Sequence, residues 1–385
     1  MSLKLIKTIK NLKNKRVLVR CDFDVPIKKS KVKGQSSKVI IIDDRRLRDS
    51  VATINYLLKK QAQVILIGHL GRPDGKVIKA LSLQPVKERL EKLLAKKIKL
   101  VNIKRYLEPA IINAIKTSSD QLIMLENLRF SDREQANCQS FAKQLASLAD
   151  IYVNNAFANS HRTHASISAI QNYLPAYGGF ALIKEIQTLS KVLIKPQRPL
   201  VLIIGGAKIE TKLPVIQKYL KQANYILVGG AVANNFIKAL GYQVGKSLID
   251  KKYLAITKKI LNQKIILPVD VITNQGIKRV DSITQQETIL DIGPATIKFY
   301  SSFIKLAKTI IWNGPLGKFE DKKFRLGTQQ ITNYVLKSKA QVVIGGGDTA
   351  EILKNKKLTK NIFISSGGGA MLEFLAGKKL PGLKN

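Results

Sequence analysis

The chain has little of what disulfide-bonded or zinc-binding proteins need. Its 385 residues include only two cysteines, Cys21 and Cys138, and three histidines. Two cysteines are too few for a disulfide framework, and neither belongs to a CxxC pair or has a histidine nearby in a zinc-binding spacing. We therefore expect two unpaired, buried thiols.

Long apolar runs are absent as well. No run approaches the ~18 to 20 residues that a membrane-spanning helix needs. The first fifteen residues alternate lysine with single apolar residues and do not form the apolar core of a signal peptide. We expect a soluble protein that is not exported and works in the cytoplasm.

Acidic residues are scarce, since 26 Asp and Glu stand against 66 Lys and Arg, for a formal charge of +40. Such a charge alone favours a polyanionic partner such as nucleic acid or an anionic membrane. The lysines are scattered through nearly every segment, however, with no basic tail and no dense basic block. This pattern favours a general excess of lysine on the solvated surface over a dedicated nucleic-acid site. Nucleic-acid binding stays open as an alternative, as does a catalytically silent scaffold.

The length indicates two domains, because one hydrophobic core stops growing near ~250 to 300 residues. Short runs rich in Val, Ile and Leu recur along the chain, each followed by helical apolar spacing, which is typical of βαβ units. These runs begin at Val17, Val64, Leu122, Ile151, Leu200, Tyr225, Thr309, Val342 and Ile362. Continuous apolar runs favour parallel strands buried on both faces, so each half predicts a doubly wound, Rossmann-like parallel sheet in an α/β fold.

Gly and Pro residues bracket one amphipathic segment between the two halves. LPAYGGF precedes it and KPQRP follows it, which predicts a connecting hinge helix. We therefore divide the chain into a first domain at 1–175, a hinge helix at 176–198, a second domain at 199–370 and a C-terminal segment at 371–385.

Ligands of open α/β sheets bind beyond the carboxyl ends of the strands, and the first half places cations and hydrogen-bonding groups there. These residues are Asp22, Asp24, His69, Arg72, Arg129, Asn154, His161, Arg162 and His164. Arginines from separate strands suit a small multi-anionic ligand, because a guanidinium grips phosphate or carboxylate oxygens bidentately. One such arginine would be an ordinary surface residue, but four strand ends with the same chemistry favour a site.

The second half places glycines at the corresponding positions. Glycine lets backbone amides approach a phosphate closely, and the N-terminus of the following helix favours an anion. The glycines lie at 205–206, 229–230, 345–347 and 367–369, with Lys208, Lys212 and Asp348 beside them. A single such turn would be an ordinary tight turn, whereas four of them suggest a nucleotide polyphosphate with a magnesium ion. Lys208 and Lys212 lie four apart and would share one face of a helix.

The sequence contains no recognisable set for nucleophilic or zinc-dependent catalysis. There is no Ser-His-Asp or Cys-His set, no HExxH motif and no obvious carboxylate pair. GGGDTA at Gly345–Ala350 matches a dinucleotide fingerprint, but it lacks a convincing βαβ partner and a ribose-binding acid, so we discount it. Phosphoryl transfer to or from a carboxylate needs no base, so arginine, lysine, backbone amides and magnesium would suffice.

Six motifs occur in an order that resembles the phosphoglycerate kinase family, and the resemblance extends from Arg16 to the SSGGGAMLEFLAGKKLPG segment. The motifs are HLGRP, LENLRF, HRTHAS, GGAKIETK, WNGPLGKFE and GGGDT. The resemblance implies reversible phosphoryl transfer between 1,3-bisphosphoglycerate and magnesium ADP, giving 3-phosphoglycerate and ATP, in glycolysis and gluconeogenesis. It also implies a monomer of two doubly wound domains whose C-terminal segment returns to the first domain.

The resemblance further implies roles for residues at matching positions. Those implied to hold the phosphoglycerate are Asp22, Phe23, Asp24, Arg46, His69, Leu70, Gly71, Arg72, Arg129 and Arg162, and Arg46 would also reach the phosphoryl group in flight. Lys208 and Lys212 would follow the charge that develops on that group, and the amides of Gly347 and Gly369 would stabilise the transition state. Those implied to hold the nucleotide are Lys212, Asn313, Glu320 (through the ribose), Gly346, Gly347 and Thr349, with Asp348 on the magnesium.

The chain departs from the family pattern at a few positions. Asp24 stands where the family has Asn, so its carboxylate is expected to repel an anionic substrate and raise the Michaelis constant. Asn155 and Ala158 replace the customary Asp and Gly, and Lys318 replaces an apolar residue beside the nucleotide. The predicted loop from residue 26 to residue 46 is longer than usual, which leaves Arg45 and Arg48 as alternatives to Arg46. None of these changes removes a catalytic charge, so we expect an active enzyme.

Overall fold

The computed structural model describes residues 3–30, 38–103, 107–353 and 356–384. The chain divides into two compact units: unit 1 comprises residues 1–187 and 379–385, and unit 2 comprises residues 188–378. The division falls within helix α6 (Phe180–Ile194), which lies inside the segment predicted as the hinge helix.

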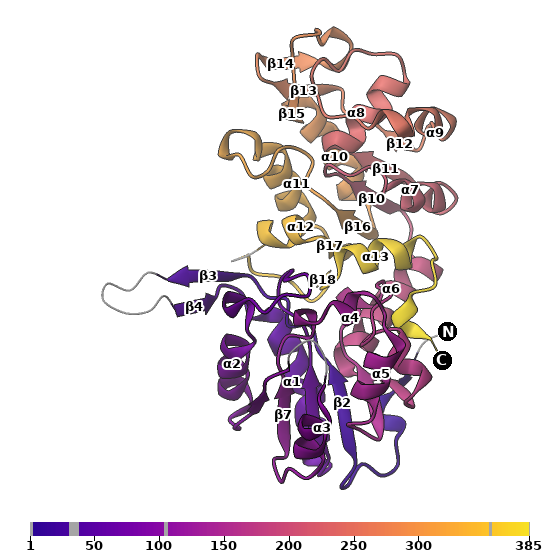
Figure 1. Cartoon of the computed structure of the whole chain (residues 1–385). Helices are drawn as coiled ribbons and strands as arrows, with labels where there is room; N and C mark the ends of the chain where they lie inside the picture. The colour runs from indigo at the N-terminus through magenta and orange to yellow at the C-terminus, as the bar shows by residue number, and fades with distance from the viewer. Residues whose placement is uncertain (1–2, 31–37, 104–106, 354–355, 385) are drawn as a thin grey trace. The chain divides into compact units, whose positions relative to one another are not determined.

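Unit 1 is built on a parallel sheet of seven strands (Figure 1). In spatial order these are β1 (Lys4–Leu5), β9 (Ala176–Gly178), β8 (Ile151–Asn154), β2 (Arg16–Arg20), β5 (Gln63–Ile67), β7 (Leu122–Leu125) and β6 (Lys99–Val101). The four strands predicted in this half are confirmed, and they lie next to one another at the centre of the sheet. Their carboxyl ends therefore lie side by side.

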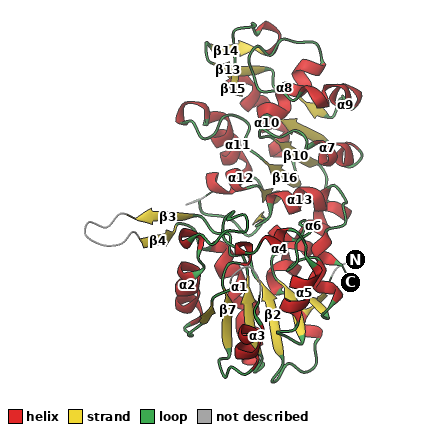
Figure 2. Cartoon of the chain, in the orientation of Figure 1, coloured by secondary structure: helices red, strands yellow, loops and turns green. Residues whose placement is uncertain are grey.

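Alternate residues of these strands belong to two hydrophobic clusters, because successive side chains of a strand point to opposite faces. Val17 and Val19 pack in one cluster with helices α1 (Arg45–Lys59) and α2 (Gln84–Leu94). Leu18 packs in the other with α3 (Pro109–Lys116) and α5 (Gln139–Ala146). Helices thus cover both faces of the sheet (Figure 2), as a doubly wound fold requires.

Unit 2 is built on a second parallel sheet, of six strands. In spatial order these are β12 (Ile265–Ile266), β11 (Tyr225–Val228), β10 (Leu200–Ile204), β16 (Thr309–Asn313), β17 (Gln341–Gly345) and β18 (Ile362–Ile364). All five strands predicted in this half are confirmed. One cluster packs the buried Trp312 against α10 (Pro294–Leu306) and α11 (Leu326–Lys337). The remaining helices are α7 (Leu213–Leu220), α8 (Gly230–Ala239), α9 (Leu254–Lys259), α12 (Gly347–Ile352) and α13 (Gly368–Leu375).

Two small antiparallel sheets were not predicted. Strands β3 (Ile27–Ser30) and β4 (Lys38–Ile41) form a hairpin, so the loop predicted from residue 26 to residue 46 is in part wrong. Residues 31–37 of that loop lie outside the described residues. Strands β13 (Asp270–Thr273), β14 (Gly276–Arg279) and β15 (Ile289–Ile292) form a three-stranded sheet in unit 2. Four-residue strands with charged residues give too short a pattern for recognition.

The two cysteines are unpaired, as expected. Cys21 is buried, but Cys138 is partly exposed, contrary to prediction, because it lies at the start of the surface helix α5. In the part of the chain that the structure describes, no helix has the length and apolar character to cross a membrane.

A buried carboxyl group in β15 caps helix α11. Asp291 is 1% exposed and accepts hydrogen bonds from the backbone N–H groups of Gly327 (2.7 Å) and Ile292 (2.9 Å). Burial raises the pKa of Asp291 to about 7. Since the unfolded chain releases this proton near pH 3.8, protonation favours the folded state. The contribution of this proton to stability is complete below pH 3.8 and is lost as the pH rises through about 7.

We expect the substitution Asp291→Asn to flatten the dependence of unfolding free energy on pH between 4 and 7. The wild-type free energy should fall with pH by up to about 1.4 kcal/mol per unit relative to the variant, because one proton is linked to folding. Urea unfolding at four pH values checks this, with Asp281→Asn as an exposed control. Parallel curves for wild type and Asp291→Asn would contradict the assignment.

Candidate functional site

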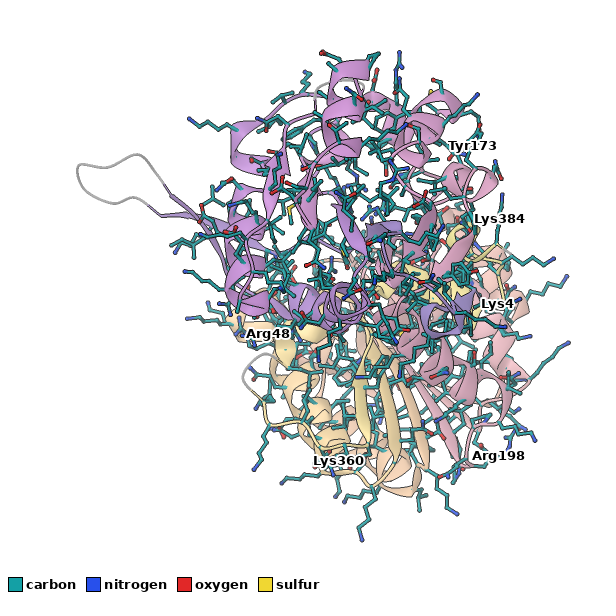
Figure 3. All side chains as sticks on the ribbon, turned by 90° about the horizontal axis from the view of Figure 1, so that it is seen from below. Lys4, Arg48, Tyr173, Arg198, Lys360 and Lys384 are labelled. Carbon is teal, nitrogen blue, oxygen red and sulfur yellow. The ribbon has the colours of Figure 1, made fainter. Side chains whose placement is uncertain are left out.

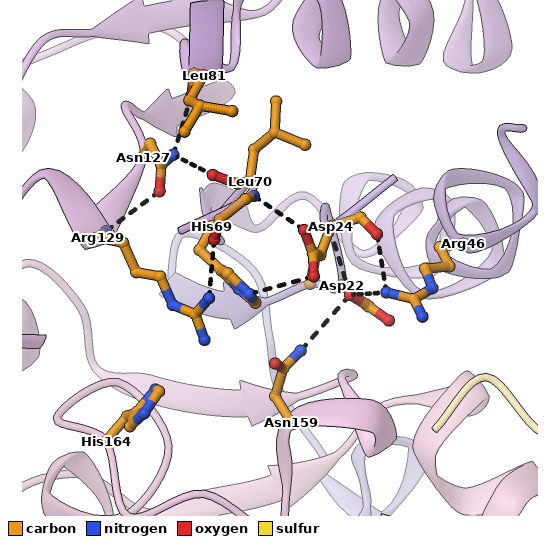
Figure 4. A network of polar contacts seen from close by, with 12 residues as sticks. Asp22, Asp24, Arg46, His69, Leu70, Leu81, Asn127, Arg129, Asn159 and His164 are labelled. Atoms are coloured by element: carbon orange, nitrogen blue, oxygen red, sulfur yellow. Dashed lines mark hydrogen bonds and ion pairs between the residues drawn. The ribbon is translucent and has the colours of Figure 1, made fainter. Parts of the chain in front are cut away.

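Four neighbouring strands of unit 1 bring charged side chains to one edge of the sheet. The residues after β2, β5, β7 and β8 meet there, because these strands are parallel and adjacent. Figure 4 shows how the side chains converge. We call the arginines gathered at this edge the cationic cluster. It consists of Arg20, Arg46, Arg72, Arg129 and Arg162.

A chain of contacts leads from the buried Arg20 through the buried His69 to the partly exposed Asp24. Arg20 is 1% exposed, and its Nε donates to Ser166 Oγ (2.9 Å) while its Nη2 lies 3.0 Å from His69 Nδ1. Because a guanidinium only donates, His69 Nδ1 is the acceptor and the ring proton sits on Nε2. That nitrogen is 3.7 Å from Asp24 Oδ2 (Figure 4). Asp24 Oδ1 in turn accepts from the backbone N–H of Gly71 (2.9 Å).

Arg46, at the start of α1, reaches the same edge. Its Nη1 donates to the backbone carbonyl of Asp24 (2.8 Å) and to Asp22 Oδ1 (3.3 Å). Asn159 Nδ2 also donates to that carboxylate oxygen (3.5 Å). Burial raises the pKa of Asp22, and the nearby Arg46 guanidinium opposes the shift. The helix thus holds Arg46 against the end of β2, while Arg45 and Arg48 form exposed pairs with Asp43 and Asp44.

Arg129 and Arg162 keep buried donors without acceptors among the described residues. Arg129 donates through Nη1 to the Gly71 carbonyl (2.8 Å), but its Nε and Nη2 are buried with no hydrogen-bond partner, as is Arg162 Nε. Burial and the neighbouring Arg162 lower the pKa of Arg129 to about 10, and burial with the charge of Arg72 lowers that of Arg162. Buried donors normally find acceptors, so the cluster fits a ligand that brings anionic oxygens.

Two histidines at this edge, His69 and His164, are neutral near pH 7. Burial and the charge of Arg20 lower the pKa of His69 well below its usual range. Burial and the charge of Arg129 lower the pKa of His164 to about 3. These two histidines therefore add no positive charge to that of the arginines.

Two residues that the resemblance placed at the ligand have their side chains in the core. Phe23 and Leu70 are 0% and 1% exposed, and a Cβ on Gly68 would lie 2.3 Å from the Phe23 ring. Only their backbone groups can face a ligand, and the Leu70 carbonyl already accepts from Asn127 Nδ2 (2.8 Å). Gly71 has a φ of +66°, which suits glycine, and Arg72 is exposed.

In unit 2 the glycine turns after β10 and β16 pack backbone against backbone. Gly206 N donates to the Pro315 carbonyl (2.7 Å). A Cβ on Gly205 would lie 2.0 Å from Pro315 O, and one on Gly314 would lie 2.4 Å from Gly205 O. No larger residue fits at Gly205 or Gly314, so glycine at these positions lets the two turns pack closely together.

Lys212 contacts the end of β16 directly, because its Nζ donates to Asn313 Oδ1. Burial lowers the pKa of Lys212 to about 8, although the nearby Asp348 carboxylate opposes the shift. Lys208 is exposed. Our expectation that the two lysines share a helix face is wrong, since both lie in the turns before α7, where Lys212 N donates to Ile209 O (2.9 Å). Pro214 in the first turn of α7 marks where the helix begins.

The third glycine turn positions groups around the start of α12. Gly346 has a φ of +105°, and the Thr349 hydroxyl accepts from the backbone N–H of Gly314 (2.9 Å). Gly347 is the first residue of α12, and Gly369 lies in the first turn of α13. The first N–H groups of a helix have no intrahelical acceptor, so both amides are available to an anion.

A cavity of about 700 Å³ adjoins this turn. Glu320 and Asp348 both line it, together with Phe319, Arg325 and Glu351. Arg325 lies over the Phe319 ring at 5.3 Å from its centroid. The cavity therefore brings together the two acidic residues that the resemblance assigned to the ribose and to the magnesium.

Sequence reasoning missed three residues of the unit 1 edge. Arg20 orients His69, Asn159 contacts Asp22, and the fully buried Glu134 accepts from Ser166 Oγ (2.6 Å), which itself accepts from Arg20. Arg20 carried a usable signal, because a charge inside the buried run VLVRCDF calls for a partner. Asn159 and Glu134 lie in loops and short helices whose folding the pattern does not reveal.

We expect Arg162→Gln to abolish stabilisation by inorganic phosphate. Without phosphate the variant should be at least as stable as wild type, because one of several mutually repelling buried cations is removed. Thermal unfolding with and without phosphate measures both effects, and Arg198→Gln in unit 2 is the control. An equal rise in melting temperature for wild type and Arg162→Gln would show that phosphate binds elsewhere.

Comparison with known proteins gives a consistent result. A family model described as phosphoglycerate kinase matches residues 6–378. The chain is 42% identical over 395 residues to a phosphoglycerate kinase of Finegoldia magna, covering 98% of each chain. It is also 42% identical over 391 residues to one of Dictyoglomus turgidum, covering 97% of this chain and 96% of the relative.

Solved structures agree with the sequence comparison. Phosphoglycerate kinase from Coxiella burnetii aligns with a TM-score of 0.82 at 36% identity. The enzyme from Pyrococcus horikoshii OT3 aligns with a TM-score of 0.82 at 29% identity. Each alignment covers 99% of this chain and 97% of the other. With these matches along almost its whole length, the chain belongs to the phosphoglycerate kinase family, whose members transfer a phosphoryl group between phosphoglycerate and an adenine nucleotide.

Proposed function

We propose that the cationic cluster of unit 1 binds the phosphoglycerate and that the glycine turns of unit 2 bind the nucleotide. The unpaired donors of Arg129 carry the first half of this proposal. Its Nε and Nη2 are buried without an acceptor among the described residues, and the oxygens of a phosphate or carboxylate group would satisfy them. The remaining residues assigned to this substrate are Asp22, Asp24, Arg46, His69, Gly71, Arg72 and Arg162, with Phe23 and Leu70 contributing backbone only.

Charge stabilisation replaces acid–base chemistry in this mechanism. The attacking oxygen belongs to a carboxylate or to a nucleotide phosphate, so no proton has to be removed from the nucleophile. Arg46, Lys208 and Lys212 would neutralise the charge on the phosphoryl group in flight, and the amides of Gly347 and Gly369 would donate to its oxygens. His69, neutral and oriented by Arg20, would donate from Nε2 to a substrate oxygen.

The nucleotide is proposed to lie along the glycine turns that follow β10, β16 and β17. Asn313, Gly346, Gly347, Lys212 and Thr349 would contact its phosphates, and Glu320 would accept from the ribose hydroxyls. The shared cavity of Glu320 and Asp348 supports this placement, because a ribose and a metal-bound phosphate lie a few bonds apart in one ligand.

Asp348 fits a magnesium ion. Its carboxylate is exposed at the start of α12 and faces a cavity with two further carboxylates, Glu320 and Glu351. Among the described residues no group of three acidic, His or Cys side chains could hold a metal alone. This suits magnesium, which takes one or two carboxylates and completes its shell with water and nucleotide phosphates. When bound, the ion would neutralise phosphate charge.

We further propose that the enzyme works as a cytoplasmic monomer whose two units must close for transfer, because each substrate is assigned to a different unit. The charge of +40 needs no nucleic-acid partner in this proposal. Figure 3 labels four exposed basic residues from separate parts of the chain, Lys4 and Lys384 of unit 1 and Arg198 and Lys360 of unit 2. A nucleic-acid shift assay across a salt series would reveal the alternative through binding that weakens steeply with salt.

Replacing Lys208 tests the assigned chemistry. In a coupled assay with 3-phosphoglycerate, ATP and magnesium, we expect Lys208→Ala to lower kcat about 10²- to 10³-fold, because it removes a charge on the transition state. The Michaelis constants should change far less. Lys218→Ala, on the surface of α7, serves as the control. Near-normal kcat in Lys208→Ala would exclude the role, and an inactive wild-type enzyme would exclude the proposed function.

The lowered pKa of Lys212 predicts a pH effect. The rate constant kcat/KM for the nucleotide should fall as the pH rises through about 8, because the ammonium group loses its charge and kcat/KM reports the free enzyme. We expect Lys212→Arg to move this fall to higher pH, since a guanidinium stays protonated. Lys218→Arg should leave the profile unchanged, and an unmoved fall in Lys212→Arg would assign it to another group.

A further inference from the structure

Helix α6 begins without a cap of its own. Two glycines, Gly178 and Gly179, precede Phe180, so no Ser, Thr, Asn or Asp stands at the usual capping position. The first N–H groups of a helix still need acceptors. Side chains from distant parts of unit 1 supply them.

Thr53 and Asn155 make this cap together. The backbone N–H of Phe180 donates to Thr53 Oγ1 (2.9 Å), and that of Ala181 donates to Asn155 Oδ1 (3.1 Å). The Thr53 hydroxyl donates to the same Asn155 oxygen (2.9 Å). Both side chains are buried, at 0% and 4% exposed. A Cβ on Gly179 would lie 2.2 Å from Asn155 Oδ1, so the close approach depends on that glycine.

Each capping residue is attached to the phosphoglycerate site by a rigid element. Thr53 lies on α1, about two turns after Arg46, which holds Asp22 and the Asp24 carbonyl. Asn155 directly follows β8, and its backbone N–H donates to the Arg20 carbonyl (2.9 Å). An edge-on contact between the rings of Tyr56 and Phe180, whose centroids are 5.4 Å apart, adds a second connection between α1 and α6.

The capped helix continues into unit 2, since the division between the units falls after Gln187. We propose that Thr53 and Asn155 are positioning residues that transmit phosphoglycerate binding at Arg46 to the start of α6, and so to the closure of the two units. An anionic ligand competes with Asp22 for the Arg46 guanidinium. When the ligand displaces Asp22 from Arg46, helix α1 shifts and moves Thr53 with it. Because Thr53 caps α6, the first turn of α6 moves as well. This inference rests on the proposed role of Arg46.

The structure also distinguishes which substitutions should preserve the contact. Asn155 Nδ2 is buried without an acceptor among the described residues, so the amide donor contributes nothing to the cap. A carboxylate at this position would keep both bonds to Oδ1 and would add favourable charge at a helix N-terminus. Asn155→Asp is therefore a conservative variant, whereas Asn155→Leu and Thr53→Val remove the acceptors.

The test compares kcat, the Michaelis constants and ligand-induced contraction measured by small-angle X-ray scattering. We expect Thr53→Val to lower kcat about five- to tenfold, the size of a modest coupling between sites, with unchanged binding of each substrate alone. Adding 3-phosphoglycerate with magnesium ADP should also reduce the radius of gyration of Thr53→Val less than that of wild type. Thr53→Ser and Asn155→Asp should retain wild-type values of both.

Thr257→Val is the matched control for lost stability. Thr257 is a buried helical threonine of unit 2, 0% exposed, and its hydroxyl donates to the Tyr253 carbonyl (2.6 Å). The Thr257→Val variant should be less stable than wild type, but its kcat and its ligand-induced decrease in radius of gyration should be those of wild type. Wild-type kcat and contraction in Thr53→Val would overturn the inference, even if Asn155→Leu fails to fold. If the wild-type chain has no kinase activity, the proposed function fails. The inference is then tested only by whether Thr53→Val reduces the ligand-induced decrease in radius of gyration.

Discussion

The structure depends on an unbalanced concentration of positive charge at the carboxyl edge of one parallel sheet. Adjacent parallel strands end together, so arginines that are far apart in the sequence meet where water is partly excluded. Arg129 and Arg162 remain short of acceptors there, and each lowers the pKa of nearby groups. Such an arrangement costs stability in the empty protein. It is favourable only when an anion supplies the missing oxygens, and we propose a phosphorylated acid as that anion.

Unit 2 offers an anionic ligand mainly backbone N–H groups, whereas unit 1 offers arginine side chains. Its glycine turns approach so closely that a Cβ at Gly205 would collide with the Pro315 carbonyl, and the turns leave amides at the starts of α12 and α13. Lys212, Asn313 and Asp348 add a small number of charged and polar groups. A nucleotide polyphosphate with magnesium suits many weak backbone donors and one carboxylate, whereas a compact acid suits several guanidinium groups. Both sheets are parallel, but they differ in strand order and in the chemistry of their strand ends.

Much of this could be read from the sequence, because continuous apolar runs reveal buried parallel strands and because strand ends converge by topology. All nine such runs are strands in the structure, and Asp22, Asp24, Arg46, His69 and Arg129 do meet. The hairpin of β3 and β4 escaped prediction, since four-residue strands carry too little pattern. Asn159, Glu134 and the cap made by Thr53 and Asn155 escaped it too, because a polar contact between residues far apart in the sequence has no local signature. Lys208 and Lys212 were assigned a helical spacing that their turns do not have.

We propose above all that a phosphorylated acid satisfies the buried donors of Arg129. A crystal structure of the chain with 3-phosphoglycerate tests it most directly. Carboxylate or phosphate oxygens of the ligand should lie within hydrogen-bonding distance of Arg129 Nε and Nη2, with Arg162 close by. A ligand bound elsewhere, with both nitrogens bonded to protein or to water alone, would contradict it.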